Sequence, residues 1–591
     1  MKIYKYILLM MTVVLSSCND SFMNRFPETE ITQKNFFKTV NDLKTYTDGF
    51  YGYIGYSYGG GDVSDDMFSN QGGYVYELMR NEISPENIGN WGWGSIKNIN
   101  YFMDQYKTVV GPESEINHYV GLARLNRAWE YYKKVRSYSD VPWYSTSLET
   151  SDKELLYKTQ DSRKVVVDSI MNDLDFAVNH ITEKVSKTRI SLWSALSIQA
   201  RVALEEASWR KYHKELNLDD SDRFYQIARD AALKVLNEGG FMLNTKGQNN
   251  LSAYKMNFVS FELSENPEMI MYAKFNKAIR KHNAQEMLNN YYGFSQDLME
   301  DYLVIQGNSA VPFHTVPNYD KKELTEVFEN RDPRMGDTFM EPGYIRTNAF
   351  IPTVPKMGVG GYVIAKFDPI TPDQIGWGDS YSDIPMIRLA EVMLIYAEAR
   401  AELGELTQAD VDMTINKLRE RVGMPTTSLA EMLGNIDPSL EKKYANVSGT
   451  QKGAILEIRR ERRVEFAGEG KRSNDLYRWD LGKRFEDFNG IYIKQLGYID
   501  LTGDGEPDIA IVKTQADADA IPEADKEKYK LIIYVLEGDV FYLSEGDHGY
   551  VKIVANKDRF NFISPKYYYT PLSDKDRLLN ENLKQTQFWG D

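Results

Sequence analysis

Cysteine is almost absent from this chain, whose 591 residues contain only Cys18. A lone thiol cannot form an internal disulfide, so Cys18 is incidental, reactive or a point of attachment. Long apolar runs are also missing. The apolar run at residues 7–14 is far shorter than the roughly 20 residues that cross a bilayer, and no second long run follows it. We therefore expect no membrane-spanning helix.

The signals of common enzymes and of nucleic-acid binding are missing as well. The six histidines are scattered without an HExxH pair, and the glycine clusters at residues 59–61 and 358–361 lack the lysine of a phosphate loop. The net charge of -16 and the lack of a long basic run argue against binding to a phosphate backbone. The sequence does not test for a glycosidase, because the spatial separation of two carboxylates cannot be read from it.

The N-terminus has the pattern of a secretory signal. Lys2 and Lys5 precede the apolar run, and Ser16 and Ser17 lie directly before Cys18. The segment resembles the lipobox of bacterial lipoproteins, in which the cysteine is acylated and becomes the first residue after cleavage. We predict a signal peptide at residues 1–17 and a lipid on Cys18; the alternative is an ordinary signal peptide with a coincidental cysteine. Lipidation would leave no thiol for disulfide, metal or nucleophile chemistry.

Apolar side chains recur at helical spacing in several segments. The clearest stripes lie at residues 122–132, 192–204, 224–235 and 389–401, and a partner helix is expected at about residues 408–421. Gly239, Gly240 and Gly404 follow two of these stripes as natural C-terminal caps. The pattern predicts a mostly α fold, in which tetratricopeptide-like helix pairs form a scaffold covered on one side by long loops and short β-strands. No strict 34-residue repeat is visible.

Three other regions read as loops and short strands, at residues 51–112, 284–380 and 485–572. Loops usually carry the function of such a scaffold. We expect residues 18–591 to form a single body, with an insertion at about residues 485–560.

The segment ILEIRRERRVEFAGEGKRSNDLYRWDLGK, residues 455–483, concentrates arginine and glutamate. Its glutamates at 457, 461 and 465 lie four residues apart, as do Arg459 and Arg463, so like charges are neighbours along a helix and destabilise it in isolation. Opposite charges must therefore come from elsewhere, and the candidates on the earlier helix are Arg388, Glu391, Glu398 and Arg400. We interpret the segment as a structural ion-pair network, because a paired arginine lowers a carboxylate pKa and makes a poor general acid.

Several segments, taken in order, resemble the SusD family of outer-membrane lipoproteins. They are NRFPETEITQKNFFKTVNDLKTYTDGFYGYI, RLNRAWEYYKKVRSYSDVPWY, ENRDPRM, GGYVIAKF, DIPMIRLAEVMLIYAEARAELGE, INKLRERVGM, the arginine and glutamate segment, and PLSDKDRLLNENLKQTQFW. The resemblance implies a non-enzymatic, cell-surface glycan-binding protein. It also implies that the protein captures oligosaccharide and passes it to a SusC-type TonB-dependent outer-membrane transporter.

A glycan site should combine aromatic rings with amide, carboxylate or guanidinium groups, because sugars present both C–H faces and hydroxyls. The stretches SDDMFSNQGGYVYELMRN and NNYYGFSQD meet this requirement, as does the loop around Trp377. By contrast, Trp91 and Trp93 are expected to pack the start of a helix. The candidate glycan-binding residues are Asp65, Asp66, Asn70, Tyr74, Tyr76, Arg80, Asn290, Tyr291, Tyr292, Phe294 and Trp377.

The stretch YIDLTGDGEPDIAIV has the spacing of a calcium loop. Asp500, Thr502, Asp504 and Asp508 occupy positions 1, 3, 5 and 9, and Glu506 can offer its carbonyl. Thr502 replaces an acid and should weaken affinity. We predict a structural calcium, with a solvated hairpin turn as the alternative.

The leading hypothesis is a lipid-anchored surface protein that binds oligosaccharide without turnover. One alternative is a SusD-like lid for a peptide or another non-glycan nutrient, since architecture does not dictate cargo. The other is a surface glycoside hydrolase, which would release reducing ends.

Overall fold

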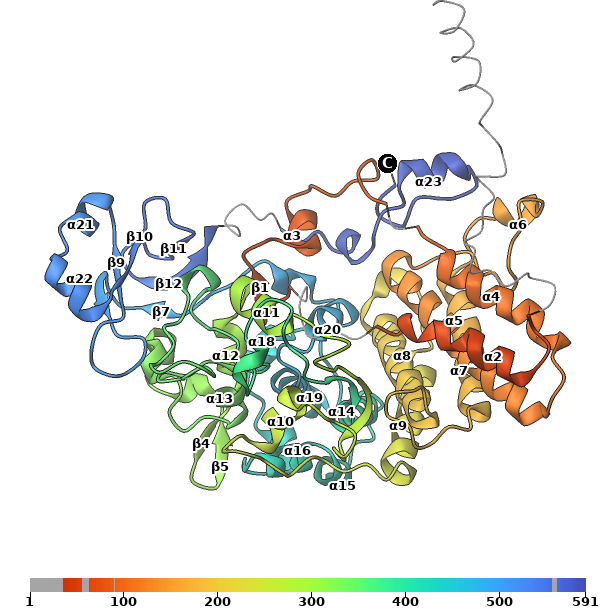
Figure 1. Ribbon diagram of the computed structural model, residues 1–591, viewed down its shortest axis with the longest axis horizontal. Helices are drawn as coiled ribbons and strands as arrows, with labels where there is room; N and C mark the ends of the chain where they lie inside the picture. Colours follow the sequence, from red (N-terminus) through yellow and green to blue (C-terminus); the bar gives the residue numbers. More distant parts are fainter. Residues whose placement is uncertain (1–35, 56–62, 90, 555–560, 591) are drawn as a thin grey trace, which may run out of the picture.

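Paired helices form the N-terminal scaffold in a computed structural model that describes residues 36–55, 63–89, 91–554 and 561–590. In Figure 1 this scaffold lies at the right, coloured from red to yellow. Its helices are α2 (Val40–Asp48), α4 (Gly94–Gln105), α5 (Glu113–Tyr138), α7 (Arg163–His180), α8 (Leu192–Tyr212) and α9 (Ser221–Glu238). Helix α5 packs on α7 and helix α8 packs on α9, which confirms the predicted helix pairs.

Small side chains lie in the seam between α8 and α9. Ala200 and Ala203 of α8 and Ala228 and Ala232 of α9 are fully buried in one apolar cluster. Alanine lets two helix backbones approach closely, and the approach buries the larger neighbouring side chains. The predicted stop is also confirmed, because α9 ends at Glu238 and Gly240 adopts a φ of 70°.

A second helical group builds the C-terminal half. It consists of α14 (Leu389–Glu402), α15 (Gln408–Met413), α16 (Ile415–Arg421), α17 (Leu429–Gly434), α18 (Pro438–Lys443), α19 (Lys452–Glu465) and α20 (Arg472–Arg478). Helix α14 packs on both α9 and α19, so it joins the two halves. The expected single helix at 408–421 is wrong. It breaks at Thr414, which has φ -117° and ψ -86° and a buried hydroxyl that donates to the Asp410 carbonyl at 2.6 Å.

Short strands and short helices fill the regions between and after the helix pairs. Strand β1 (Met67–Ser69) pairs with β3 (Tyr292–Phe294), β2 (Met269–Ala273) with β6 (Ile384–Arg388), and β4 (Val304–Gln306) with β5 (Ser309–Val311), all antiparallel. The short helices are α3 (Tyr74–Met79), α6 (Lys153–Leu156), α10 (Ala253–Val259), α11 (Ala284–Tyr291), α12 (Gln296–Asp301), α13 (Arg334–Thr338) and α23 (Asp574–Leu579).

A small β-rich lobe occupies residues 492–553 and is the blue region at the left of Figure 1. One sheet has the order β11–β12–β7, and the other has the order β10–β9–β8. The strands are β7 (Tyr492–Ile493), β8 (Gly497–Ile499), β9 (Ile509–Val512), β10 (Ile532–Val535), β11 (Phe541–Leu543) and β12 (Gly549–Ile553). The helices α21 (Gln515–Asp519) and α22 (Glu523–Tyr529) connect the parallel pair β9 and β10.

The predicted charge network lies buried around α19. Glu465 is fully buried and accepts from Arg388 at 2.6 Å, Arg421 at 2.7 Å and Arg334 at 3.0 Å. On the opposite side of α19, Arg463 donates to Asp66 and Asp301, each at 2.5 Å. The interpretation of residues 455–483 as a structural ion-pair network is confirmed.

The expected partners on α14 behave differently from one another. Glu398 pairs with Arg478 at 2.5 Å, and Glu391 pairs with Lys471 at 3.0 Å, so both reach the predicted segment. Arg400 instead pairs with Glu405 and Asp410 and takes no part in the network around α19.

Two sequence predictions concern the membrane: the lipid-bearing N-terminus and the lack of a membrane-spanning helix. Residues 1–17 and Cys18 lie outside the described residues, so the signal peptide and the lipid stay predictions. None of the helices in the described ranges is both long and apolar enough to cross a bilayer.

Trp91 and Trp93 pack at the start of α4, as expected. The Trp91 ring meets Tyr138 of α5 edge-on at 4.9 Å between ring centroids, and the Lys134 ammonium lies 4.4 Å from the Trp93 ring centroid.

We predict that Arg388→Ala destabilises the protein by about 3–5 kcal/mol, because it leaves buried carboxylates without their cation. Thermal and urea unfolding of the wild type and the variant measure the loss. Arg223→Ala is the matched control, since Arg223 and Asp168 form an exposed pair whose removal should cost under about 1 kcal/mol. An equal loss in both variants would contradict the structural role of the network.

Acid should also weaken the fold through these carboxylates. Burial alone would raise the pKa of Glu465, but Arg421, Arg388 and Arg334 outweigh it and hold that pKa well below its usual 4.5. The same balance, with Arg201 and Lys471, lowers the pKa of Glu391. A lowered folded-state pKa contributes stability that is present above about pH 4.5 and is lost as the pH falls through the folded-state value.

We therefore expect the melting temperature to fall steeply as the pH drops from about 4.5 to 3. Calorimetry across this range tests the expectation. Added salt at pH 7 should change the melting temperature little, because buried pairs are poorly screened. An unchanged melting temperature at pH 3 would contradict the account.

Candidate functional site

The pairing of β1 with β3 brings the two predicted glycan-binding stretches together. Met67 lies opposite Phe294 and Ser69 lies opposite Tyr292. Just beyond the ladder, the Asn70 backbone N–H donates to the Tyr291 carbonyl at 2.9 Å. Segments more than 200 residues apart in the chain therefore share one edge.

An exposed tryptophan lies beside this edge. The Trp377 side chain is 61% exposed, and its ring centroid is 6.3 Å from that of Tyr291 at an interplanar angle of 77°. Gly376 and Gly378 flank it with φ values of 140° and 78°, which side chains with a Cβ rarely adopt. These glycines let the loop turn sharply on both sides of the ring.

The loop that carries Trp377 is fixed at both ends. The Gln374 side chain accepts from the Tyr381 backbone N–H at 3.0 Å and from the Ser382 hydroxyl at 3.0 Å. Two surface pairs add to this, Lys277 with Asp373 at 2.7 Å and Lys281 with Asp379 at 3.0 Å. The hydrogen bonds and ion pairs therefore hold the loop in place, so less conformational entropy of the loop is lost when a ligand binds to the Trp377 ring.

Amides and a lysine border the two rings. The Lys356 ammonium donates to the Asn290 side-chain oxygen at 2.7 Å, and the Asn70 amide donates to the Asn290 carbonyl at 3.4 Å. Burial lowers the pKa of Lys356. We call the surface formed by Asn70, Asn290, Tyr291, Lys356 and Trp377 the aromatic face.

Lys356, which was not among the predicted site residues, joins the aromatic face from the end of the loop at 344–356. Phe350 on the same loop is 94% exposed. The loop reaches α11 through Arg346, which pairs with Asp368 at 2.9 Å and with Glu286 at 3.5 Å. The run TNAFIPTVP, with its asparagine and prolines around an apolar pair, is a loop signal that could have suggested Phe350.

Four of the candidate glycan ligands are buried, and burial corrects their predicted role. Tyr76 is 1% exposed and Phe294 is fully buried, where its ring packs on Phe339 at 4.9 Å. Asp65 and Asp66 are 2% and 3% exposed. A side chain that no solvent reaches cannot contact a glycan on this surface.

Asp65 and Asp66 belong to the ion-pair network instead. Asp65 accepts from Arg472 at 2.7 Å and from Arg484 at 2.5 Å, and Asp66 accepts from Arg463 at 2.5 Å. Burial would raise the pKa of Asp65, but the surrounding arginines hold it well below its usual range. The sequence shows Asp65 and Asp66 close to glycines and aromatic residues. It does not show that arginines far along the chain pair with them.

The remaining candidates divide between two places. Tyr292 is half-buried against the core beside the aromatic face. Tyr74 is 41% exposed, but its hydroxyl donates to Thr570 at 3.2 Å, and Arg80 pairs with Glu82 at 2.7 Å. The glycan-binding roles of Asn70, Tyr74, Arg80, Asn290, Tyr291, Tyr292 and Trp377 stay predictions.

The candidate calcium loop connects β8 to β9. Asp500 accepts from the backbone N–H groups of Gly503 at 2.6 Å and Gly505 at 2.9 Å, and Asp508 accepts from those of Leu501 and Thr502. Asp504 accepts from the Glu506 backbone N–H at 2.9 Å. Within the described ranges, no three His, Cys, Asp or Glu side chains gather closely enough to hold a metal ion. The calcium assignment stays a prediction.

The aromatic face has the chemistry of a binding surface. Its rings can stack on C–H faces, and its amides and ammonium can bond to hydroxyls. The nearby carboxylates of Asp368, Asp373 and Asp379 are each paired with a cation.

Comparison with known proteins shows which protein family this chain resembles. The family model described as "SusD family" matches residues 246–589, and one described as "Starch-binding associating with outer membrane" matches residues 28–204. A SusD-like protein of Bacteroides ovatus is 26% identical over 258 residues, which are 42% of this chain and 46% of that protein. A SusD-like protein of Formosa agariphila is 23% identical over 542 residues, 83% of this chain and 93% of the relative.

Solved structures show the same fold. A SusD-like protein and a SusD-like carbohydrate binding protein, both from Bacteroides fragilis, each align with a TM-score of 0.64 at 18% identity. The alignments cover 95% and 93% of this chain and the whole of each solved chain. Since the first family model also matches more than half of the 591 residues, the chain belongs to the SusD family.

Proposed function

We propose that this protein captures oligosaccharide at the outer surface of the cell and delivers it to a SusC-type TonB-dependent transporter. The observation that carries the proposal is the exposed Trp377 ring next to Tyr291, bordered by the amides of Asn70 and Asn290. Sugar rings need an aromatic platform together with hydrogen-bonding groups at its rim. Trp377 lies on a loop that is fixed at both ends, and Tyr291, Asn70 and Asn290 lie on the neighbouring edge formed by β1 and β3.

The transporter partnership and the outer-membrane location rest on the family and on the N-terminus. The family resemblance implies delivery to a SusC-type barrel, and the lipobox with Cys18 would anchor the protein to the membrane through lipid. A peptide or other non-glycan nutrient is the second candidate cargo, because a related fold can carry a different ligand.

The first test is a glycan-array and calorimetry screen of protein lacking residues 1–18. We expect one polysaccharide class to bind, and we expect Trp377→Ala and Tyr291→Ala each to weaken binding at least about tenfold, as loss of a central aromatic contact usually does. Tyr498→Ala is the matched control, because Tyr498 is a 44% exposed tyrosine on β8 in the C-terminal lobe.

Each alternative has its own outcome in this screen. Released reducing ends would show a hydrolase, and binding of peptides without glycans would show a different cargo. Glycan binding that Trp377→Ala and Tyr291→Ala leave unchanged would place the site elsewhere.

We also propose that the loop at 500–508 holds a structural calcium. Asp500, Asp504 and Asp508 would have to exchange some of their backbone hydrogen bonds for the ion. We expect calcium at about 1 mM, typical of weak extracellular sites, to raise the melting temperature relative to EDTA, and Asp500→Asn to abolish the rise. Magnesium at the same concentration is the control. Equal melting temperatures with calcium and with EDTA would exclude the site.

A further inference from the structure

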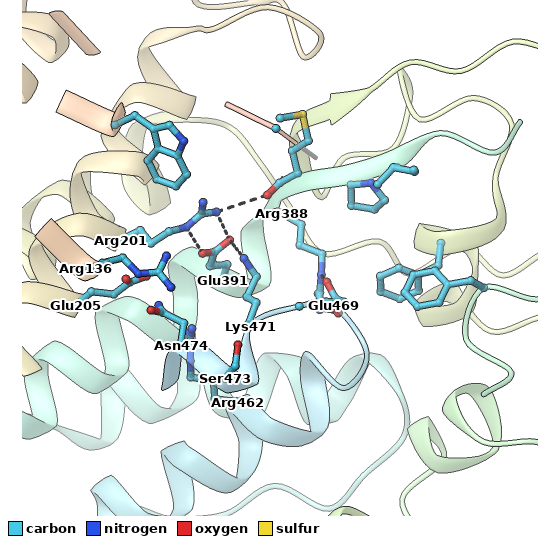
Figure 2. A pocket seen from close by; sticks show the side chains of 18 residues that line it. Arg136, Arg201, Glu205, Arg388, Glu391, Arg462, Glu469, Lys471, Ser473 and Asn474 are labelled. Carbon is cyan, nitrogen blue, oxygen red and sulfur yellow. Dashed lines mark hydrogen bonds and ion pairs between the residues drawn. The ribbon is translucent and has the colours of Figure 1, made fainter. Parts of the chain in front are cut away.

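A charged cavity of about 280 Å³ lies between the two helical groups, apart from the aromatic face. Figure 2 shows it between α5 and α8 of the N-terminal scaffold and the α14, α19 and α20 region of the C-terminal half. Its volume exceeds by several times the roughly 30 Å³ that one water takes up in the liquid. The cavity can therefore hold a small molecule together with water.

Cations outnumber carboxylates in the cavity lining. The carboxylates are Glu205, Glu391 and Glu469, and the cations are Arg136, Arg201, Arg388, Arg462 and Lys471. Glu391 is shared by Arg201 at 2.6 Å and Lys471 at 3.0 Å, so one negative charge faces two positive charges.

Glu205 offsets this excess only in part, because it is only partly ionised at neutral pH. Its side chain is 5% exposed, and burial raises its pKa to about 7. The pKa of Lys471 is lowered, because the side chain is buried and lies near the charges of Arg201 and Arg462. The side chains that line the cavity therefore carry more cations than carboxylates, although Arg388 and Arg462 also pair with Glu465 and Asp475 behind the lining.

Three buried polar atoms on the cavity wall lack a hydrogen-bond partner in the described part of the chain. They are Arg462 Nη1, Glu205 Oε2 and Asn474 Oδ1. The Arg462 side chain is only 5% exposed, and its Nε is already committed to Asp475 at 2.7 Å. Leaving a buried charged donor unsatisfied is costly, so a group inside the cavity should accept from Arg462.

We propose that this cavity binds a small oxyanion, a carboxylate, phosphate or sulfate, which accepts hydrogen bonds from Arg462 Nη1 and the Lys471 ammonium. Glu205 in its protonated form can donate a further bond through its unpartnered oxygen. Arg462 and Lys471 come from the C-terminal half and Glu205 comes from α8, so the anion would tie the two helical groups together.

The test measures the melting temperature and the calorimetric binding of acetate, phosphate and sulfate at constant ionic strength set with sodium chloride. The protein used is the chain lacking residues 1–18. We expect at least one oxyanion to raise the melting temperature of the wild type in a saturable way. A response to acetate alone assigns a carboxylate, and a response to phosphate or sulfate assigns a tetrahedral anion.

Two variants make the assignment specific to this cavity. Lys471→Gln removes a charged donor and should weaken binding roughly tenfold or more. Asn474→Asp adds a negative charge of nearly the same shape and should abolish binding, while circular dichroism confirms folding. Lys417→Gln, at an exposed position on α16, is the control and should bind as the wild type does.

Absence of any shift beyond that of chloride would overturn the proposal and leave the cavity to water. An equal response in the wild type, Lys471→Gln and Asn474→Asp would also overturn it, because the anion would then bind elsewhere.

Discussion

The buried ion pairs around α19 are the constraint on which the rest of the structure depends. Charges taken out of water are tolerated only where each one meets opposite charges at short range, so every element that supplies a partner is fixed relative to α19. Glu465 holds Arg388 and Arg421, and Arg463 holds Asp66. These contacts join segments that lie up to about 400 residues apart in the chain.

The same constraint positions the binding surface. Asp66 is held by Arg463, and the next residue, Met67, begins the strand that pairs with Phe294. That pairing sets the edge from which Tyr291 and Asn290 project, beside Trp377. The buried charges thus act as the rigid support, and the exposed loops supply the ligand chemistry. A binding surface on a rigid support loses less entropy when a ligand binds.

Local patterns in the sequence predicted the helical scaffold well. The apolar stripes at 192–204 and 224–235 became α8 and α9, because helical periodicity and alanine seams are encoded within a few turns. The break at Thr414 was missed, since no glycine or proline marks it in the sequence. The charge network was inferred correctly from like charges at four-residue spacing, but most of its partners were not.

The candidate site was harder to predict, for a physical reason. Composition identifies stretches rich in aromatics and amides, but burial depends on contacts with distant segments. In the sequence, Asp65 and Asp66 resemble surface carboxylates. In the structure they are buried and pair with Arg463, Arg472 and Arg484, which lie about 400 residues away in the chain. Tyr291 and Trp377 were identified separately, and their proximity appears only in the fold.

A crystal structure of the protein lacking residues 1–18 with its preferred oligosaccharide bound would test this binding surface most directly. We expect a sugar ring stacked on Trp377, within hydrogen-bond distance of Asn290, with the ion pairs around α19 unchanged. Sugar density located away from Trp377 and Tyr291 would contradict it.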